Sequence, residues 1–577
     1  MNRFVIAVGA SVAALAVGAA ASAAPSQGTQ SDAAFAASYA AEGVVNVSAT
    51  TQRVSCYAPE VAYAAALTAA DGYPGGGETA CPGATTGEQT SAFATQDVSN
   101  PPLLVKDHSE SDIRVDSANP QHLIGQSKWF VSAEGYNHLL GFYESWDGGK
   151  TWPVQGHVPG YEGWTDNTDP VGAFDPWGNF YSLLLPYEFV YSNSGGHVFN
   201  NGSKQANPGQ PPEAISVAVH PARAAGQQSA TNWITSHNGH PDFVFTAPNA
   251  DTNTPDKQWI AIDTNPRSPH YGRVYAMFTQ FVLNPSRILL SYADAHADGT
   301  HTDWSAPQVL PTIAGHPFDT YLLPHVAPDG TLFTTVTNNP VSKGFLNNSV
   351  YLISSRDGGV SWQGPTLVAP SVLTPTYLNT TFTEGIVNSF GVGTKQVNGR
   401  WPLYVAYENE DPDGFSRVYL TGSLDGGATW TAPVRVNGGP DDVEALQPRV
   451  EAAANGTVAV AFYDRRLGCP TSSASGVQLD PLAPAGKRNY CINTAIQFYS
   501  PNLTPIGQNI RLSQFTWDPQ LNAPKRFCIC GSGTFVGDYF GLDFGGGYAY
   551  TTSVSTYDYG QNPSNYQQQI VAKVALP

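Results

Sequence analysis

Short apolar segments recur along the chain, and each of them follows a polar or acidic residue. Asp112-Ile-Arg-Val, Asp256-Lys-Gln-Trp-Ile-Ala-Ile and Gln447-Pro-Arg-Val are examples. A turn that contains Gly or Asn comes next and leads into a second apolar segment, such as Gly178-Asn-Phe-Tyr. Strand, turn and strand in this order predict antiparallel meanders, and about seven such units start between residues 111 and 577.

Three segments share a second pattern, Ser-x-Asp-Gly-Gly-x-Ser/Thr-Trp. Its Asp carboxylate can accept hydrogen bonds from the backbone N–H groups of a tight turn, and its glycines allow positive φ angles. The Trp has the size to pack between neighbouring sheets. We therefore expect structural turns in these segments, whose aspartates are Asp147, Asp357 and Asp425.

The spacing of these turns indicates a regular array of similar units. Asp357 and Asp425 are 68 residues apart, and Asp147 lies 210 residues before Asp357, which is close to three such periods. Two degenerate units should lie between them, one ending near Asp298-Gly-Thr-His-Thr-Asp-Trp and one covering residues 214–245. This repeat predicts an all-β fold, a β-propeller with six or seven blades, whose last blade could be shared with the N-terminal part of the chain.

Residues 110–577 resemble the sialidase-like β-propellers of secreted bacterial proteins, in which this turn is the Asp box, or bacterial neuraminidase repeat. The three turns carry the resemblance, together with residues 256–263, 461–466 and 535–542. The resemblance implies Asp boxes on the outer turns of the blades and a glycan-acting site at one end of the central channel.

The resemblance to sialidases also implies a specific set of catalytic residues. They use an arginine triad, a tyrosine nucleophile assisted by a glutamate, and an aspartate as acid/base. Their first arginine lies in a Phe-Arg-Ile-Pro motif. This chain lacks that motif, and its nearest stretch is Asp112-Ile-Arg-Val.

Acidic residues at the unit starts would form a ring around the mouth of the channel. Close carboxylates raise one another's pKa or recruit a cation, so the ring could hold a glycosidase carboxylate pair or a calcium ion. Each acid could instead cap its own turn. Six of the seven starts supply an acid, namely Asp112, Asp169, Asp256, Asp319, Glu384 and Asp538.

Other candidate site residues accompany these acids. An arginine can hold a carboxylate-bearing sugar through two parallel hydrogen bonds. The arginines could equally pair with acids such as Asp464 or Glu451 and tie blades together, and Tyr539 could be an interblade aromatic residue. The candidate catalytic residues are Asp538, Tyr539, Glu384 and Asp464, and the candidate substrate-binding residues are Arg449, Arg465, Arg466, Asp169, Asp256 and Asp319.

Composition narrows the class of partner. The net charge of −19 disfavours nucleic acid and anionic membrane surfaces. A basic start, an apolar run and Ala21-Ser-Ala predict an export signal over residues 1–23, and no other segment is long and apolar enough to span a bilayer. Residues 24–109 predict an irregular extension ahead of the propeller at 110–577. We expect a secreted monomer that acts on a glycan, with no certain cofactor and with calcium left open.

The six cysteines suit an oxidising compartment. Cys56 and Cys81 bracket one loop, and Cys469 and Cys491 bracket another, so we expect two local disulfides. Cys528-Ile-Cys530 predicts a further disulfide with an unassigned partner, with a zinc site as the alternative.

The sequence is compatible with three functions, because a propeller fold does not decide among them. The favoured hypothesis is a secreted glycoside hydrolase. The alternatives are a non-catalytic propeller that binds carbohydrate or protein at the cell surface, and a rigid structural platform. Converging charged residues at the mouth would favour the enzyme, and a mouth plugged by apolar side chains would favour the others.

Overall fold

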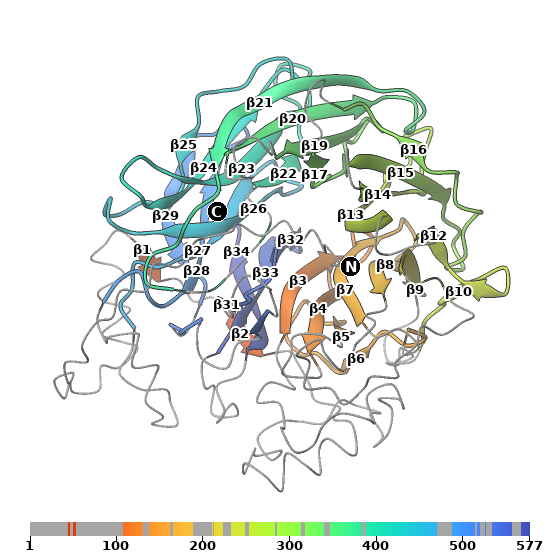
Figure 1. The fold of residues 1–577 in the computed structure, drawn as a ribbon, viewed down its shortest axis with the longest axis horizontal. Helices are drawn as coiled ribbons and strands as arrows, with labels where there is room; N and C mark the ends of the chain where they lie inside the picture. The colour runs from red at the N-terminus through yellow and green to blue at the C-terminus, as the bar shows by residue number, and fades with distance from the viewer. Residues whose placement is uncertain are drawn as a thin grey trace, which may run out of the picture.

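Strands are the only regular secondary structure of the described residues, and they form seven sheets arranged in a ring (Figure 1). The structure is a computed structural model. It describes residues 44–46, 50–53, 108–130, 138–161, 166–187, 211, 213–222, 232–247, 253–282, 286–312, 318–339, 347–380, 382, 385, 388–469, 487–513, 516–519, 525–526, 533–556 and 567–577.

The first four blades follow one another along the chain. Blade one contains β3 (His108–Val115), β4 (Leu123–Phe130), β5 (His138–Ser145) and β6 (Val154–His157). Blade two contains β7 (Asp166–Phe174), β8 (Phe180–Tyr187), β9 (Glu213–His220) and β12 (Phe243–Ala247). Blade three contains β13 (Asn253–Ile262), β14 (Arg273–Val282), β15 (Arg287–Asp294) and β16 (Gln308–Val309). Blade four has its first strand in two pieces, β17 (Asp319–Thr320) and β18 (His325–Val326), followed by β19 (Leu332–Asn338), β20 (Asn347–Ser355) and β21 (Gln363–Leu373).

The last three blades complete the ring. Blade five contains β22 (Asn388–Val392), β23 (Leu403–Glu410), β24 (Ser416–Ser423) and β25 (Val434–Arg435). Blade six contains β26 (Ala445–Ala452), β27 (Val458–Asp464), β28 (Asn493–Tyr499), β29 (Pro505–Arg511) and, outside them, β1 (Val44–Asn46). Blade seven contains β32 (Gly541–Gly545), β33 (Tyr548–Ser555), β34 (Gln568–Ala575) and β2 (Thr50–Arg53). Two small hairpins are β10 (Ser236–His237) with β11 (His240–Pro241) and β30 (Lys525–Arg526) with β31 (Gly533–Thr534).

The two ends of the chain meet in blade seven. The strand β2 pairs antiparallel with β34, with Thr50 opposite Lys573 and Arg53 opposite Ile570. The strand β1 adds to blade six in parallel with β29. The structure therefore has seven blades, and the prediction that the N-terminal part of the chain shares the last blade is confirmed.

The hydrophobic core lies between the blades rather than inside a single sheet. Each sheet is covered on both faces by its neighbours, so all eight residues of β9 and all seven residues of β27 are buried. The largest apolar cluster runs through blades two to five and contains Val171, Trp259, Phe333 and Phe390. Burial of this apolar surface is the main favourable contribution to holding the ring together.

The three Ser-x-Asp-Gly-Gly segments form the same hydrogen-bonded turn. In blade one, Asp147 Oδ1 accepts hydrogen bonds from the backbone nitrogens of Lys150 and Thr151, both at 2.9 Å. Its Oδ2 accepts a hydrogen bond of 2.7 Å from the Thr151 hydroxyl. Asp425 accepts the same three bonds in blade five, and Asp357 accepts bonds from the backbone nitrogen and the hydroxyl of Ser361 in blade four. Each turn joins the third and fourth strands of its blade.

The position of these turns separates them from the channel mouth. Strand direction alternates within a blade, so the third strand ends at the face opposite to the one where the first strand begins. The hydroxyl of Ser361 donates to Asp357 and lowers the pKa of this carboxyl to about 2. These carboxylates therefore accept their hydrogen bonds within their own turns.

The single disulfide of the described residues joins Cys469 to Cys491, as the sequence predicted. The other four cysteines (Cys56, Cys81, Cys528 and Cys530) and the predicted export signal lie outside the described residues. The part of the chain that the structure describes contains no helix that could span a membrane.

Candidate site at the mouth of the central channel

The first strands of several blades share a local distortion at the channel mouth. In β3, β7, β13 and β26 the pairing register shifts near the start of the strand, as expected for a β-bulge. A residue other than glycine has a positive φ at this point in each strand, and Tyr321 (φ 50°) has one at the break between β17 and β18. The others are Glu110 (φ 51°), Asp169 (φ 53°), Lys257 (φ 55°) and Gln447 (φ 47°). Strained conformations of this kind cluster at functional sites.

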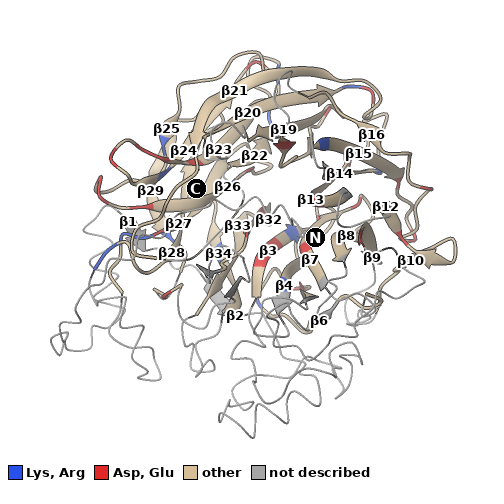
Figure 2. Ribbon diagram, in the orientation of Figure 1, with Lys and Arg blue, Asp and Glu red and all other residues tan. Residues whose placement is uncertain are grey.

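Three buried carboxylates converge at this mouth. Glu110, Asp169 and Asp538 each have a carboxylate oxygen within 4.8 Å of the other two. The hydroxyl of Thr168 donates to Asp169 Oδ1 at 2.5 Å and lies 3.4 Å from Glu110 Oε2. Residues from blades one, two and seven thus meet in one place, and acidic and basic segments lie together near β3 and β7 around the centre of the ring (Figure 2).

Two lysines neutralise part of this charge. Lys257 Nζ lies 2.7 Å from Asp538 Oδ2, 3.5 Å from Asp169 Oδ2 and 3.8 Å from Asp256 Oδ1. Lys128 Nζ lies 3.2 Å from Glu110 Oε2 and 3.8 Å from Asp169 Oδ1. The ammonium group of Lys257 therefore places one positive charge among three of these carboxylates.

The environment separates the ionisation behaviour of Glu110 and Asp169. Burial, reinforced by the neighbouring Asp169, raises the pKa of Glu110 well above its usual value. Burial also acts to raise the pKa of Asp169, but Lys257 and Lys128 outweigh it and lower that pKa. Burial raises the pKa of Asp256 to about 6. Adjacent carboxyl groups with pKa values moved in opposite directions are the usual arrangement of an acid and a base in a catalytic site.

A small cavity lies beside these charges. Its volume of about 10 Å³ leaves room for about one water molecule. Three buried oxygen atoms of the mouth residues lack a hydrogen-bond partner among the described residues, and they belong to Asp538 (Oδ1), Gln258 (Oε1) and Gln447 (Oε1). The backbone of Gly385 lies against Asp538, since a Cβ there would come within 2.4 Å of Asp538 Oδ1. Acceptors of this kind favour a ligand that donates hydrogen bonds.

Tyr539 directly follows Asp538, and its contacts hold it in the packing between blades. Its hydroxyl donates to the carbonyl oxygen of Pro170 at 2.8 Å, and its ring packs edge-on against Trp259 with centroids 5.1 Å apart. Burial, followed by the charge of Glu110, raises its pKa well above the usual value. A hydroxyl that is held in this way is poorly suited to be the nucleophile that the sequence suggested.

A second layer of charges lies further along the same first strands. Asp112, which was expected at the mouth, accepts a hydrogen bond from the backbone of Gly172 at 2.8 Å and pairs with Arg114 at 3.0 Å. Arg449 pairs with Glu451 at 2.7 Å, and His325 Nε2 lies 3.1 Å from the same Glu451 oxygen. Arg449 is therefore an ion-paired residue of this layer, and the contacts of the described residues include no ion pair between it and the mouth carboxylates.

The adjacent arginines are paired and fully buried. Arg466 pairs with Asp464 at 2.6 Å, and Arg465 pairs with Glu444 and donates to the carbonyl oxygen of Leu378. These contacts fit the alternative interpretation, in which the arginines tie segments of the fold together.

Two predicted site residues remain, Asp319 and Glu384. Asp319 is buried and accepts a hydrogen bond from Asn338 at 2.8 Å within blade four. Glu384 lies outside the described residues. The structure thus brings together Asp169, Asp256 and Asp538 from the predicted ring.

Glu110, Lys128 and Lys257 are mouth residues that the sequence interpretation missed. Glu110 lies two residues before the assigned start at Asp112, and Lys257 was part of a resembling segment without a role. The bulge that the first strands share is the feature that places them. Because both faces of a strand such as β3 are buried, the extra residue of a bulge leaves no mark in the apolar pattern.

Comparison with known proteins gives matches among solved structures alone. No family model matches the chain, and a search of curated proteins finds no match. A protein of unknown function from Dyadobacter fermentans is 11% identical with a TM-score of 0.39, and the match covers 82% of this chain and 96% of that one. A Hadza microbial sialidase is 13% identical with a TM-score of 0.36, covering 63% and 66%. A Trypanosoma rangeli sialidase is 11% identical with a TM-score of 0.32, covering 81% of this chain and 54% of the sialidase.

These similarities are too low to carry an argument about activity. The fold is established by the seven sheets themselves, with their shared strand order and the closure of the last sheet by β2. The chain is a seven-bladed β-propeller, and sialidases are among the solved structures to which it is similar.

Proposed function

We propose that this protein is a secreted glycoside hydrolase whose acid–base pair is Glu110 and Asp169. The observation that carries the proposal is the contact of two buried carboxyl groups with pKa values moved in opposite directions. Glu110 holds a proton that it can donate, and Asp169 stays ionised beside two lysines. Strongly perturbed ionisable groups that converge in a cleft are candidates for catalysis.

The geometry supports a retaining reaction. The carboxylate oxygens lie within 4.8 Å of each other, which is less than the roughly 6.5–9.5 Å that an inverting glycosidase needs to place a water molecule between its two carboxyl groups. Glu110 protonates the glycosidic oxygen as its bond to the anomeric carbon breaks, and Asp169 attacks that carbon. A water molecule then hydrolyses the glycosyl ester and returns its proton to Glu110.

The charges favour a neutral or amino sugar over sialic acid. Four carboxylates and two lysines share the mouth, and the ion pairs of Arg114, Arg449, Arg465 and Arg466 lie elsewhere in the described part of the chain. The unpartnered oxygens of Asp538 and Gln258 can accept hydrogen bonds from sugar hydroxyl or ammonium groups. A glycosyl group is larger than the 10 Å³ cavity, so binding requires side chains at the mouth to move.

A second candidate function is a non-catalytic binding propeller. The specific observation in its favour is that Lys257 and Lys128 already pair with the mouth carboxylates, around a cavity of about one water. In that case the charge network acts as a rigid plug, and a glycan or protein binds on the surface around it.

The test is hydrolysis of fluorogenic substrates by the purified protein and two variants, Glu110→Gln and Asp169→Asn. The panel contains neutral glycosides, amino-sugar glycosides, sialosides and uronides. Wild type should cleave a neutral or amino sugar, and each substitution should lower kcat/KM by about 100-fold or more, because it removes general-acid or nucleophilic catalysis.

Asp357→Asn is the matched control, because its carboxylate serves a turn on the opposite face. Activity that survives in both mouth variants would exclude this acid–base pair. A folded wild-type protein that cleaves none of the panel would favour the binding propeller, which a glycan-binding assay with the same variants then examines.

A further inference from the structure

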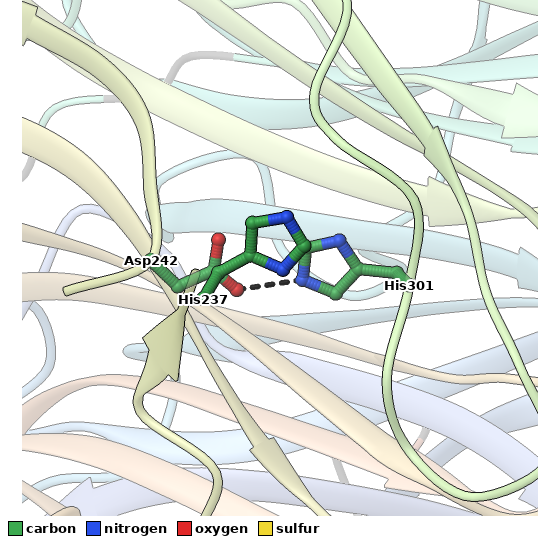
Figure 3. A group of neighbouring side chains, drawn as sticks. All are labelled: His237, Asp242 and His301. Atoms are coloured by element: carbon green, nitrogen blue, oxygen red, sulfur yellow. Dashed lines mark hydrogen bonds and ion pairs between the residues drawn. The ribbon is translucent and has the colours of Figure 1, made fainter. Parts of the chain in front are cut away.

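His237, Asp242 and His301 lie close together (Figure 3). They lie on the face opposite the mouth, because His301 follows the third strand of its blade and Asp242 precedes the fourth strand of the blade before it. Each has a ligand atom within 4.8 Å of the other two. His237 belongs to β10 and Asp242 directly precedes β12, so both come from blade two, whereas His301 follows β15 in blade three. The group therefore bridges two neighbouring blades.

The position of this group in the repeat is informative. Blades one, four and five have the Ser-x-Asp-Gly-Gly turn between their third and fourth strands. In blade two the same connection contains the hairpin of β10 and β11, and in blade three it contains the degenerate segment from Asp298 to Trp304. The histidines and Asp242 thus lie where two successive blades have lost the regular turn.

His301 is oriented as a metal-binding histidine would be. Its Nδ1 lies 2.7 Å from the carbonyl oxygen of Thr302, which can only accept, so Nδ1 carries the hydrogen in this bond. Its Nε2 lies 2.6 Å from Asp242 Oδ2 and donates a hydrogen bond to this carboxylate, so a metal ion bound by both groups would replace that hydrogen and move the two atoms further apart. A histidine that donates one ring N–H to a backbone carbonyl presents its other nitrogen to a metal in many metal sites.

A second hydrogen bond fixes the carboxylate of Asp242. It is buried, and its second oxygen, Oδ1, accepts a hydrogen bond of 3.0 Å from Trp304 Nε1. This bond fixes the carboxylate while Oδ2 points toward His301. Support of this kind for a ligating carboxylate is characteristic of built metal sites.

His237 completes the group and is its movable member. Its ring stacks on that of His301, with centroids 4.7 Å apart and planes inclined by 7°. Its Nε2 lies 2.7 Å from Asp303 Oδ1, a carboxylate whose side chain is 82% exposed. Because the lone pair of each nitrogen lies in its own ring plane, a shared ion requires one ring to turn. His237 is partly exposed on a two-residue strand and is the ring that can turn.

We propose that His237, Asp242 and His301 bind a divalent transition metal such as Zn²⁺, which joins blade two to blade three. Two imidazoles and a carboxylate suit zinc and its neighbours in the periodic table, whereas calcium prefers six to eight oxygen ligands. Asp303 or water completes the coordination on the exposed side. The proposal is independent of glycan hydrolysis, because the site lies on the opposite face.

The experiment measures Zn²⁺ binding by calorimetry with the full-length, chelator-treated protein, and its thermal midpoint with and without Zn²⁺. Wild type should bind one equivalent and show a higher thermal midpoint with metal. His237→Gln and His301→Gln should each weaken binding by about tenfold or more. Co²⁺ in place of Zn²⁺ should give visible absorption bands of low-symmetry coordination in wild type that His301→Gln lacks.

His240→Gln is the matched control, because His240 is exposed in the same hairpin and bonds only within it in the described contacts. It should bind like wild type. His237→Gln keeps the buried His301–Asp242 pair, so it remains informative if His301→Gln does not fold. Equal affinity in all variants, absence of binding in wild type, or displacement of Zn²⁺ by excess Ca²⁺ would each overturn the proposal.

Discussion

Glu110 shows at the scale of one residue how burial couples ionisation to folding. Its carboxyl group is buried between Asp169 and Lys128, and its pKa is raised well above the usual value of about 4.3. The folded protein therefore holds this proton more tightly than the unfolded chain does. The resulting stabilisation is complete below the ordinary pKa and is lost as the pH rises through the raised pKa.

The Glu110→Gln variant should reveal this coupling, because an amide cannot ionise. We expect its thermal midpoint to rise relative to wild type as the pH increases from about 4 to about 8. Asp357→Asn is the comparison, because Asp357, with its pKa of about 2, stays ionised over this range. A difference between Glu110→Gln and wild type that is the same at every pH would show that Glu110 does not titrate in this window.

Single residues also show where sequence reasoning ends. Asp169, Asp256 and Asp538 could be predicted because an acid before an apolar strand is a local pattern. Glu110 and Lys257 could not, because their position depends on the bulge that turns them into the mouth. His237 and His301 are 64 residues apart and belong to different blades, so no spacing motif connects them. The positions of these four residues depend on pairing between segments that are distant in the sequence.

At the scale of one element, the Ser-x-Asp-Gly-Gly turn contains two glycines with different constraints. Gly426 has a φ of 77°, and a Cβ added there would meet nothing within 4 Å. Gly427 has a φ of 97°, and its Cβ would lie 2.3 Å from Leu352 Cδ2 in blade four. The first position requires only a left-handed backbone, and the second also requires space between two blades.

Alanine substitutions at these glycines should separate the two effects. Gly426→Ala should cost about 1–2 kcal/mol of stability from the backbone alone. Gly427→Ala should cost more, because Leu352 must move in a packed interface. Chemical denaturation of both variants under the same conditions measures the difference. Equal costs would mean that the contact with Leu352 relaxes freely.

The strands and turns were the part of this molecule that the sequence predicted best. The turn motif and the strand pairs repeat at the length of one blade, so the sequence alone predicted a propeller and placed two degenerate units in blades two and three. The choice between six and seven blades depended on how the ring closes. That closure pairs segments from opposite ends of the chain, and no local pattern encodes it.

The whole molecule is a closed ring, and its closure is a contact between the two ends of the chain. In blade seven, β2 covers the outer edge of β34 through four residue pairs. Without β2 this edge would offer unpaired backbone groups to solvent or to another molecule. The strand β1 in blade six makes a second, parallel attachment.

Two N-terminal deletions should measure the contribution of β2. A variant without residues 24–46 lacks β1, and a variant without residues 24–53 lacks both strands. We expect the larger deletion to lower the thermal midpoint by about 2–4 °C more than the smaller one and to increase association at high concentration. Scanning calorimetry and light scattering provide the two readings. Identical midpoints would show that the other three strands of blade seven suffice.

The pairing of β2 with β34 also has a consequence for the order of events during synthesis. Gln52 and its partner Val571 are separated by more than 500 residues, so the early strand must wait until nearly the whole chain has been made. Contacts at such separation form slowly, because a long loop must close first. A chain that stops early therefore cannot complete its last blade, and its open edge distinguishes it from a finished molecule for the proteases and chaperones that it meets.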